Sequence, residues 1–240
     1  MSDLSADLNP ASNLSPDTVT CLLSWDAAKL LWDPWESEPI PAYGRFFKRC
    51  VDLMIAIPSL ILLAPVFAIT AIAIKLDSKG PVFYNSIRVG LRGRRFVCRK
   101  FRSMILNADE LKERLRKHNQ RRGPTFKIAD DPRITPFGRF LRRYSLDELP
   151  QLVNVIVGDM SIVGPRPHPL DDVARYRPEH LRRCAVKPGL TGLWQIRARQ
   201  SPSFELNMKL DQMYIRGWSL LFDLRIILET FAVVCRGDGQ

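Results

Sequence analysis

The sequence predicts a predominantly helical α+β protein that attaches to a membrane through an N-terminal helix-break-helix. Residues 53–74 form 22 uncharged positions interrupted by two prolines, and residues 80–240 alternate short strand-like runs with helical patterns. The 240 residues carry a net charge of +11, which indicates an anionic partner. We expect an N-terminal extension over residues 1–42, a membrane segment over 43–79 and a folded domain over 80–240.

Charge is distributed unevenly along the chain. Residues 1–42 hold seven Asp or Glu and one Lys, a net charge of −6, whereas residues 88–143 hold 18 Lys or Arg and five Asp or Glu, a net charge of +13. Residues 1–20 are predicted to be disordered, and they lack the basic start of a signal peptide. Residues 21–35 are predicted to form a short helix. It packs on the main domain or a partner, or it lies at a membrane surface with tryptophan as its anchor.

The apolar run is the strongest physical signal. As a helix, Leu53–Ile74 would be about 33 Å long, close to one hydrocarbon thickness, and it shows no polar stripe. Pro58 and Pro65 each remove a backbone donor and kink a helix, and basic residues flank both ends, which favours the same side for both. We therefore expect a re-entrant segment that breaks at Ala64-Pro65. A proline-kinked transmembrane helix is the alternative.

The rest of the chain reads as short strands followed by helices. Short strand-like or loop segments are expected over 82–90 and 94–104. Helices are expected over 105–122, near 137–143, near 146–157, around 169–183 and over 218–235. The last of these is strongly apolar and either belongs to the core or lies on the membrane.

Several function classes are disfavoured. The five cysteines lie far apart without a CxxC pair, so neither a disulfide framework nor a cysteine zinc site is expected. Only three histidines are present and there is no HExxH, which argues against a zinc hydrolase. The long apolar run argues against a nucleic-acid binder.

Two adjacent carboxylates, Asp147 and Glu148, follow the basic block and open an apolar helix. One interpretation is a capping box, with Ser145 as the N-cap and Glu148 bonded back to it. The other is a site for a divalent cation and a pyrophosphate, because three arginines lie within eight residues of the pair. Those arginines are Arg139, Arg142 and Arg143.

Two turns present single bases. Gly164-Pro165-Arg166-Pro167 is a rigid turn whose guanidinium either is solvated or binds a phosphate. Lys187 begins a Lys-Pro-Gly-Leu-Thr-Gly loop of small residues that permits close approach to a phosphate. Arg88 and the run 99–104 add further bases. A solvated basic face explains any one of these, but it explains less well their number beside a membrane segment and a carboxylate pair.

Together these segments resemble the small monotopic phosphoglycosyl transferases, the bacterial sugar transferase family that starts polyprenol-linked glycan assembly. The resemblance runs from about Lys48 to Gly237. Its motifs occur in the family's order: the apolar segment, KFRSM (100–104), DDPRITPFGRFLRRYSLDELPQLVNVIVGDMSIVGPRP (130–167), KPGLTGLWQI (187–196), LDQMYI (210–215) and WSLLFDL (218–224).

The resemblance implies a Mg²⁺-dependent enzyme on the cytoplasmic face of a bacterial inner membrane. Such enzymes move a phosphosugar from a UDP-sugar to polyprenol (undecaprenyl) phosphate, releasing UMP and initiating exopolysaccharide or other cell-surface glycan synthesis. Asp147 takes the position of the nucleophile, and Glu148 that of the residue that helps to hold metal and phosphates. The residues implied in substrate binding are Arg88, Arg142, Arg143, Pro165, Arg166, Pro167 and Lys187. A homo-oligomer stays open, as does the identity of the sugar.

This chain departs from the family pattern at three positions. Ala64 replaces the usual serine before Pro65, Pro58 is additional, and Ser86 stands where the family often has glutamine two residues before its arginine, here Arg88. Outside this family, the rival interpretation is a basic membrane-binding scaffold without enzymatic activity. In such a scaffold Asp147 would be dispensable.

Overall fold

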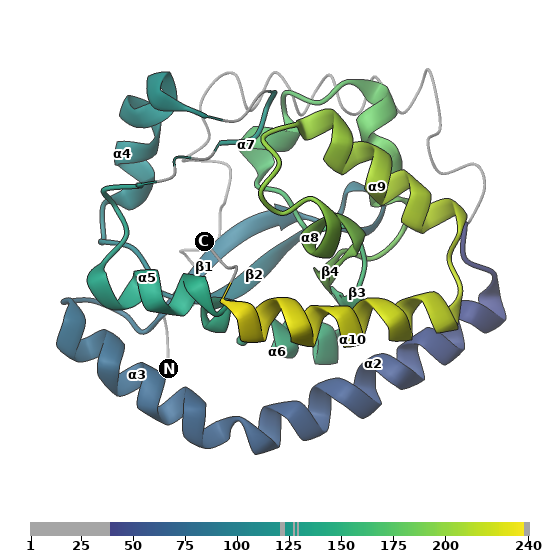
Figure 1. Ribbon diagram of the computed structural model, residues 1–240, viewed down its shortest axis with the longest axis horizontal. Coiled ribbons are helices and arrows are strands. Elements are labelled where there is room, and N and C mark those ends of the chain that lie inside the picture. Colours follow the sequence, from purple (N-terminus) through teal and green to yellow (C-terminus); the bar gives the residue numbers. More distant parts are fainter. Residues whose placement is uncertain (1–38, 121–122, 127, 129, 238–240) are drawn as a thin grey trace, which may run out of the picture.

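The computed structural model describes the chain except for residues 1–38, 121–122, 127, 129 and 238–240, so the helix expected over 21–35 lies outside the described residues. A small hairpin and a second strand pair sit among helices (Figure 1). In chain order the elements are α2 (Ala42–Leu62), α3 (Ala64–Asp77), β1 (Phe83–Val89), η1 (Leu91–Gly93), β2 (Arg95–Phe101), α4 (Ala108–Leu115), η2 (Arg116–His118), α5 (Pro136–Arg143), η3 (Leu146–Glu148), α6 (Gln151–Val157), β3 (Ser161–Val163), α7 (Leu170–Val173), η4 (Pro178–Ala185), β4 (Gly189–Thr191), α8 (Leu193–Arg197), α9 (Phe204–Arg216) and α10 (Leu220–Arg236).

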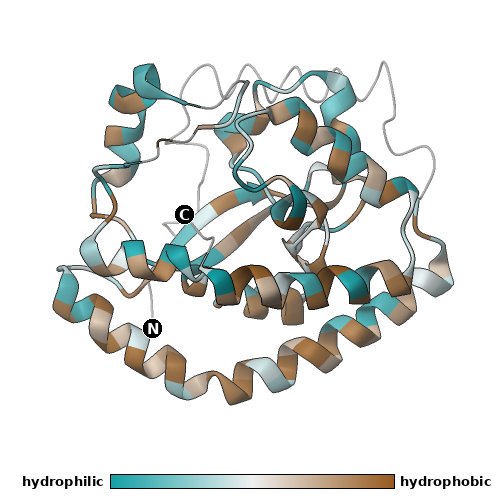
Figure 2. Cartoon of the chain, viewed as in Figure 1, coloured by the Kyte–Doolittle hydropathy of each residue, from teal (hydrophilic) through white to brown (hydrophobic). Residues whose placement is uncertain are grey.

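Helices α2 and α3 form a bent arc along one edge of the molecule (Figure 1), and hydrophobic residues dominate that arc in Figure 2. Among the described residues, no single helix is both long and apolar enough for a membrane crossing. The α2–α3 pair reaches that length and composition together, with a bend of 58°. The break falls at Leu63, directly before the expected Ala64-Pro65 pair, and Pro65 lies in the first turn of α3, where its missing donor costs nothing. Pro58 is accommodated inside α2.

Polar anchors hold the first half of the arc to the body. Lys48 donates to Asp223 of α10 over 2.6 Å, and both side chains are buried. Arg49 donates to two carbonyls at the end of α6, over 2.5 and 2.7 Å. Asp52 accepts from the Ser161 hydroxyl, over 2.9 Å, and from a backbone amide of β3, over 2.8 Å. Because these groups are satisfied internally, α2 can bury one polar face while its opposite face stays apolar and exposed.

The two segments expected over 82–90 and 94–104 form one two-stranded sheet, and β3 and β4 form a second. β1 and β2 pair antiparallel, with Arg88 opposite Phe96 and Tyr84 opposite Lys100. β3 and β4 pair parallel. The α+β, mostly helical class expected from the sequence is therefore confirmed.

Helix α10 confirms the apolar helix expected over 218–235 and explains its composition. Its inner face buries Ile226 in the main core beside α2 and the two small strands, whereas Leu221, Leu228 and Phe231 are exposed on the other face. Only one face of this helix therefore contributes to the core.

Three expected helices are shorter than predicted. The single helix around 169–183 is wrong: α7 ends at Val173, and Arg177 is extended because Pro178 follows it. The helix over 146–157 is divided into η3 and α6, because Pro150 has no N–H to donate to Leu146. The turn closes instead through Leu149, over 3.2 Å. The helix over 105–122 is reduced to α4 and η2.

Candidate active site

Asp147 and Glu148 lie in the tight turn η3, between α5 and α6, and both are buried, with 6% and 8% of their surfaces exposed. The preceding Ser145 adopts a left-handed conformation with φ of 56°, which is uncommon for a residue other than glycine. Its hydroxyl makes no cap bond within the turn but accepts from Arg199, over 2.8 Å. The capping-box interpretation is therefore wrong.

Glu148 is held by two cations from distant segments. Lys100 of β2 donates to Glu148 Oε1 over 2.7 Å. Arg166 donates to the same carboxylate from both terminal nitrogens of its guanidinium. Nη1 donates to Oε2 over 2.9 Å, and Nη2 donates to Oε1. Burial by itself would raise the pKa of Glu148, but the charges and hydrogen bonds of Arg166 and Lys100 lower it well below its usual range. Glu148 is therefore ionised and committed to these two side chains.

Asp147 has a different environment although it is the next residue. Its contact with Lys100 is longer, 3.9 Å from Nζ to Oδ2. Burial raises its pKa above the usual range, the charge of Lys100 opposes that shift, and Glu148 adds to it. Glu148 is thus held in a bidentate ion pair with Arg166, whereas Lys100 is the one cation of the described residues that forms an ion pair with Asp147, at 3.9 Å. Two neighbouring carboxylates whose pKa values are shifted in opposite directions are characteristic of catalytic pairs.

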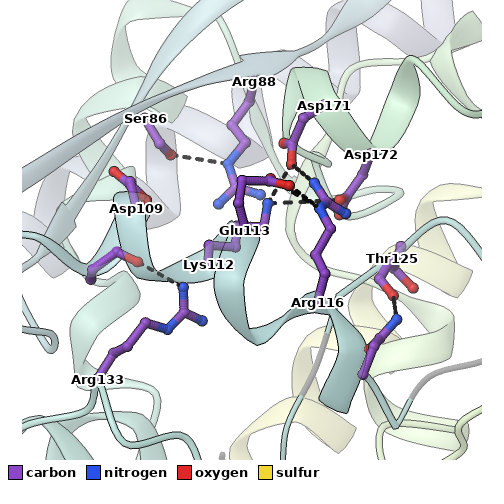
Figure 3. Close-up of polar contacts among 12 residues, drawn as sticks. Ser86, Arg88, Asp109, Lys112, Glu113, Arg116, Thr125, Arg133, Asp171 and Asp172 are labelled. Carbon is purple, nitrogen blue, oxygen red and sulfur yellow. Dashed lines mark hydrogen bonds and ion pairs between the residues drawn. The ribbon is translucent and has the colours of Figure 1, made fainter. Parts of the chain in front are cut away.

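Arg142 lies near Asp147, and Arg88 is bonded to the turn that carries Arg166. Arg142 lies within electrostatic range of Asp147 and donates to the Ser103 hydroxyl over 2.9 Å. Arg88 donates to the Pro167 carbonyl over 3.3 Å and to the Ser86 hydroxyl over 3.0 Å, the second contact being visible in Figure 3. Ser86 therefore orients this arginine where the resemblance leads one to expect glutamine.

Two of the expected substrate-binding residues point elsewhere. The Lys187 side chain lies near Arg49 and Gly158, and its pKa is lowered by burial and by the charge of Arg49. The Arg143 guanidinium lies over the ring of Tyr144, 5.8 Å from its centre. No contact joins either side chain to Asp147 or Glu148 in the described part of the chain, and their binding roles stay predictions.

Lys100 is a site residue that the sequence alone does not single out. It lies in the run 99–104 of bases, any one of which a solvated face explains. The pairing of β1 with β2 places Lys100 directly opposite Tyr84, and two-residue alternation puts it on the same hairpin face as Arg88. The sequence signal that could have identified Lys100 is the period-two alternation along the segment 94–104.

The donor set fits a magnesium ion bound together with substrate. The described residues contain no group of three or more His, Cys, Asp or Glu that could hold a metal by themselves. Mg²⁺ usually keeps several waters and takes one or two carboxylates plus substrate phosphates. The Asp147 carboxylate, with Glu148 beside it, meets that requirement, although Glu148 is already engaged by Arg166 and Lys100.

Comparison with known proteins adds independent information. The family described as bacterial sugar transferase matches residues 43–237. The exopolysaccharide production protein ExoY of Sinorhizobium fredii is 41% identical over 211 residues, covering 86% of this chain and 93% of that protein.

Two longer relatives carry more specific names. The undecaprenyl-phosphate galactose phosphotransferase of Salmonella typhimurium is 43% identical over 200 residues, and the UDP-glucose:undecaprenyl-phosphate glucose-1-phosphate transferase of Escherichia coli is 38% identical over 206. Each match covers 82% of this chain but only 42% of the relative. The chain therefore spans nearly the whole of ExoY and less than half of these two relatives.

Proposed function

The chain belongs to the bacterial sugar transferase family, and from that premise we propose that it transfers a sugar-1-phosphate from a UDP-sugar to polyprenol phosphate, releasing UMP. One observation carries the proposal: Lys100 and Arg166 form ion pairs with Glu148, and the adjacent Asp147 lies 3.9 Å from Lys100. The relatives named for undecaprenyl phosphate support the acceptor class, and the name of ExoY supports a role in exopolysaccharide production.

In the proposed first step, an Asp147 carboxylate oxygen attacks the β-phosphorus of the UDP-sugar. A phosphorus–oxygen bond forms to Asp147, the pyrophosphate bond breaks, and UMP leaves with the electron pair. In the second step, a phosphate oxygen of the lipid attacks the same phosphorus and expels the carboxylate. Two substrates of opposite solubility then use one pocket in turn.

The surrounding side chains supply charge at the reacting phosphates. Lys100 and Arg166 are pre-oriented by Glu148, so they can face developing negative charge without reorganising during the reaction. Mg²⁺, when bound with the nucleotide, would neutralise phosphate charge as a Lewis acid. Asp147, assisted by Glu148, would hold it.

The membrane arrangement is part of the proposal. A polyprenol phosphate keeps its tail in the bilayer, so the enzyme must work at the interface. The bent α2–α3 pair with an exposed apolar face, basic residues at both ends, and the exposed face of α10 support a re-entrant insertion from the cytoplasmic side of the inner membrane.

The decisive experiment follows the covalent step. The purified protein is mixed with Mg²⁺ and a panel of UDP-sugars without lipid acceptor, and UMP and intact protein mass are measured. We expect one UDP-sugar to give stoichiometric UMP and a phosphosugar adduct on Asp147, located by peptide mapping, and Asp147→Asn to give neither. UMP that appears only when lipid is added would refute the covalent route, and no turnover with any sugar would favour the scaffold interpretation.

A further inference from the structure

The turn that carries Arg166 has few backbone donors of its own. Pro165 and Pro167 flank the arginine and have no backbone N–H, and Gly164 donates to the Thr191 carbonyl over 2.9 Å. Most of the bonds that hold the turn and its two neighbours are accepted by backbone carbonyls from donors on several different elements. These bonds are Tyr214 to Val163 (3.2 Å), Gly189 to Pro165 (2.9 Å), Arg183 to Arg166 (2.7 Å), Arg88 to Pro167 (3.3 Å) and Val89 to His168 (3.2 Å).

Arg183, on η4, makes the bond to the carbonyl of Arg166 itself. Its side chain is buried, with 5% of the residue exposed. One nitrogen donates to His168 Nδ1 over 2.7 Å and to the Tyr176 hydroxyl over 2.8 Å. The other reaches the Arg166 carbonyl and the Asp211 carboxylate, the latter at 2.8 Å. The planar fork therefore joins four groups that a single ammonium could not bridge.

Asp211 provides the counter-charge from α9. It is 1% exposed, and a buried guanidinium without such a partner would be strongly destabilising. Tyr214 follows three residues later on the same helix and bonds the Val163 carbonyl at the start of the turn. Helix α9 thus braces the segment at both ends, through Tyr214 directly and through Asp211 by way of Arg183.

We infer that Arg183, paired with Asp211, is a positioning residue that sets where the Arg166 guanidinium meets Glu148 and the nucleotide phosphates. The inference rests on the proposed function, since it assigns Arg166 to the UDP-sugar. Arg183 acts through the backbone of Arg166 and touches neither Asp147 nor Glu148 in any contact of the described residues. A misplacement of about 1 Å in such a clamp can lower the rate about 100-fold.

Arg183→Lys separates positioning from simple stability. The lysine keeps the charge opposite Asp211 but loses the second arm to the Arg166 carbonyl. We expect the KM for UDP-sugar to rise about tenfold, which corresponds to about 1.4 kcal/mol of binding, while the KM for polyprenol phosphate changes less than twofold. Hydrogen exchange should quicken at the amides of Val163, Gly164, Arg166 and His168, the non-proline residues of 163–168. Asp211→Asn retains Arg183. It should therefore raise the KM for UDP-sugar and quicken hydrogen exchange as well, but by less than Arg183→Lys does.

Arg133→Lys is the matched control. Arg133 is also buried, and it pairs with Asp131 and donates to a backbone carbonyl, that of Ala108 over 3.0 Å. Arg133→Lys should lower thermal stability about as much as Arg183→Lys does. It should raise neither the KM for UDP-sugar nor the rate of hydrogen exchange at residues 163–168.

A second comparison tests the route of action. If Arg183 works through Arg166, Arg183→Lys should add less than a twofold effect in an Arg166→Lys background, whereas full additivity would overturn the inference. Unchanged exchange at residues 163–168, or an equal rise in both KM values, would also overturn it. If the parent protein turns over no UDP-sugar, the proposed function fails, and the exchange experiment still decides whether Arg183 holds the turn.

Discussion

Replacing Lys100 with methionine removes the cation that touches both carboxylates while keeping a side chain of similar length. Lys100 Nζ lies 2.7 Å from Glu148 and 3.9 Å from Asp147. At an effective dielectric constant of about 20, a unit charge at the longer distance is worth about 4 kcal/mol. Relaxation and the remaining Arg166 reduce this, so we expect a loss of about 2 to 4 kcal/mol of transition-state stabilisation, or about 30- to 1,000-fold in rate.

The assay is the rate of UMP release in a single turnover without lipid acceptor, which isolates the first chemical step. Lys112→Met is the matched control, because Lys112 has a side-chain exposure of 17% against 15% for Lys100. Lys112 pairs with Asp171 over 2.5 Å (Figure 3) and makes no ion pair with Asp147 or Glu148 among the described residues. We expect the control to retain the parent rate within about threefold, as for a partly exposed ion pair. If Lys100→Met is no slower than the control, Lys100 takes no part in the chemistry.

Four further predictions test other parts of the reasoning. Glu148→Gln should release Arg166 and raise the KM for UDP-sugar, measured by steady-state UMP release; an unchanged KM would contradict the clamp. EDTA should abolish UMP release, and Mg²⁺ or Mn²⁺ should restore it; full activity in excess chelator would exclude a metal. Cysteines placed at positions 45 and 79 should be labelled from the same side of sealed vesicles, whereas labelling from opposite sides would establish a span. Burial raises the pKa of Asp172 to about 6, so the folded state binds the extra proton between about pH 4 and 6 and stability falls as pH rises through that window. Thermal unfolding should therefore show Asp172→Asn more stable than the parent at pH 8, by up to about 3 kcal/mol, and equal to it at pH 4; identical curves would refute the shift.

Local pattern was sufficient for several elements of the fold. The pattern over 82–90 and 94–104 predicted strand-like or loop segments where β1 and β2 lie, and two prolines in an apolar run predicted the break at Leu63 within one residue. The apolar helix α10 was expected within two residues of its observed start. These features depend on neighbours in the chain, so the sequence contains all that is needed to predict them.

The longer helices were harder because single residues overrode their periodicity. Pro178 interrupts the helix expected around 169–183, and Pro150 converts the start of the one over 146–157 into the tight turn that holds the two carboxylates. A capping box at Ser145 was one of two interpretations of this segment, but Ser145 has a left-handed backbone and its hydroxyl accepts from Arg199, 54 residues away. Tertiary contacts overrode local propensity at these points.

The sequence by itself determined the chemical inventory of this protein: an apolar segment with a break, a strongly basic central block, an Asp-Glu pair and a Pro-Arg-Pro turn in the order of one family. Only the tertiary structure decided which carboxylate is engaged, because the cations that grip Glu148 come from Lys100, 48 residues earlier, and Arg166, 18 residues later. It likewise placed the Lys187 side chain beside Arg49 and Gly158 and the Arg143 guanidinium over Tyr144, and it tied Arg166 to α9 through Arg183. The physical reason is that charge stabilisation depends on distance in space and on burial, and neither follows from spacing along the chain.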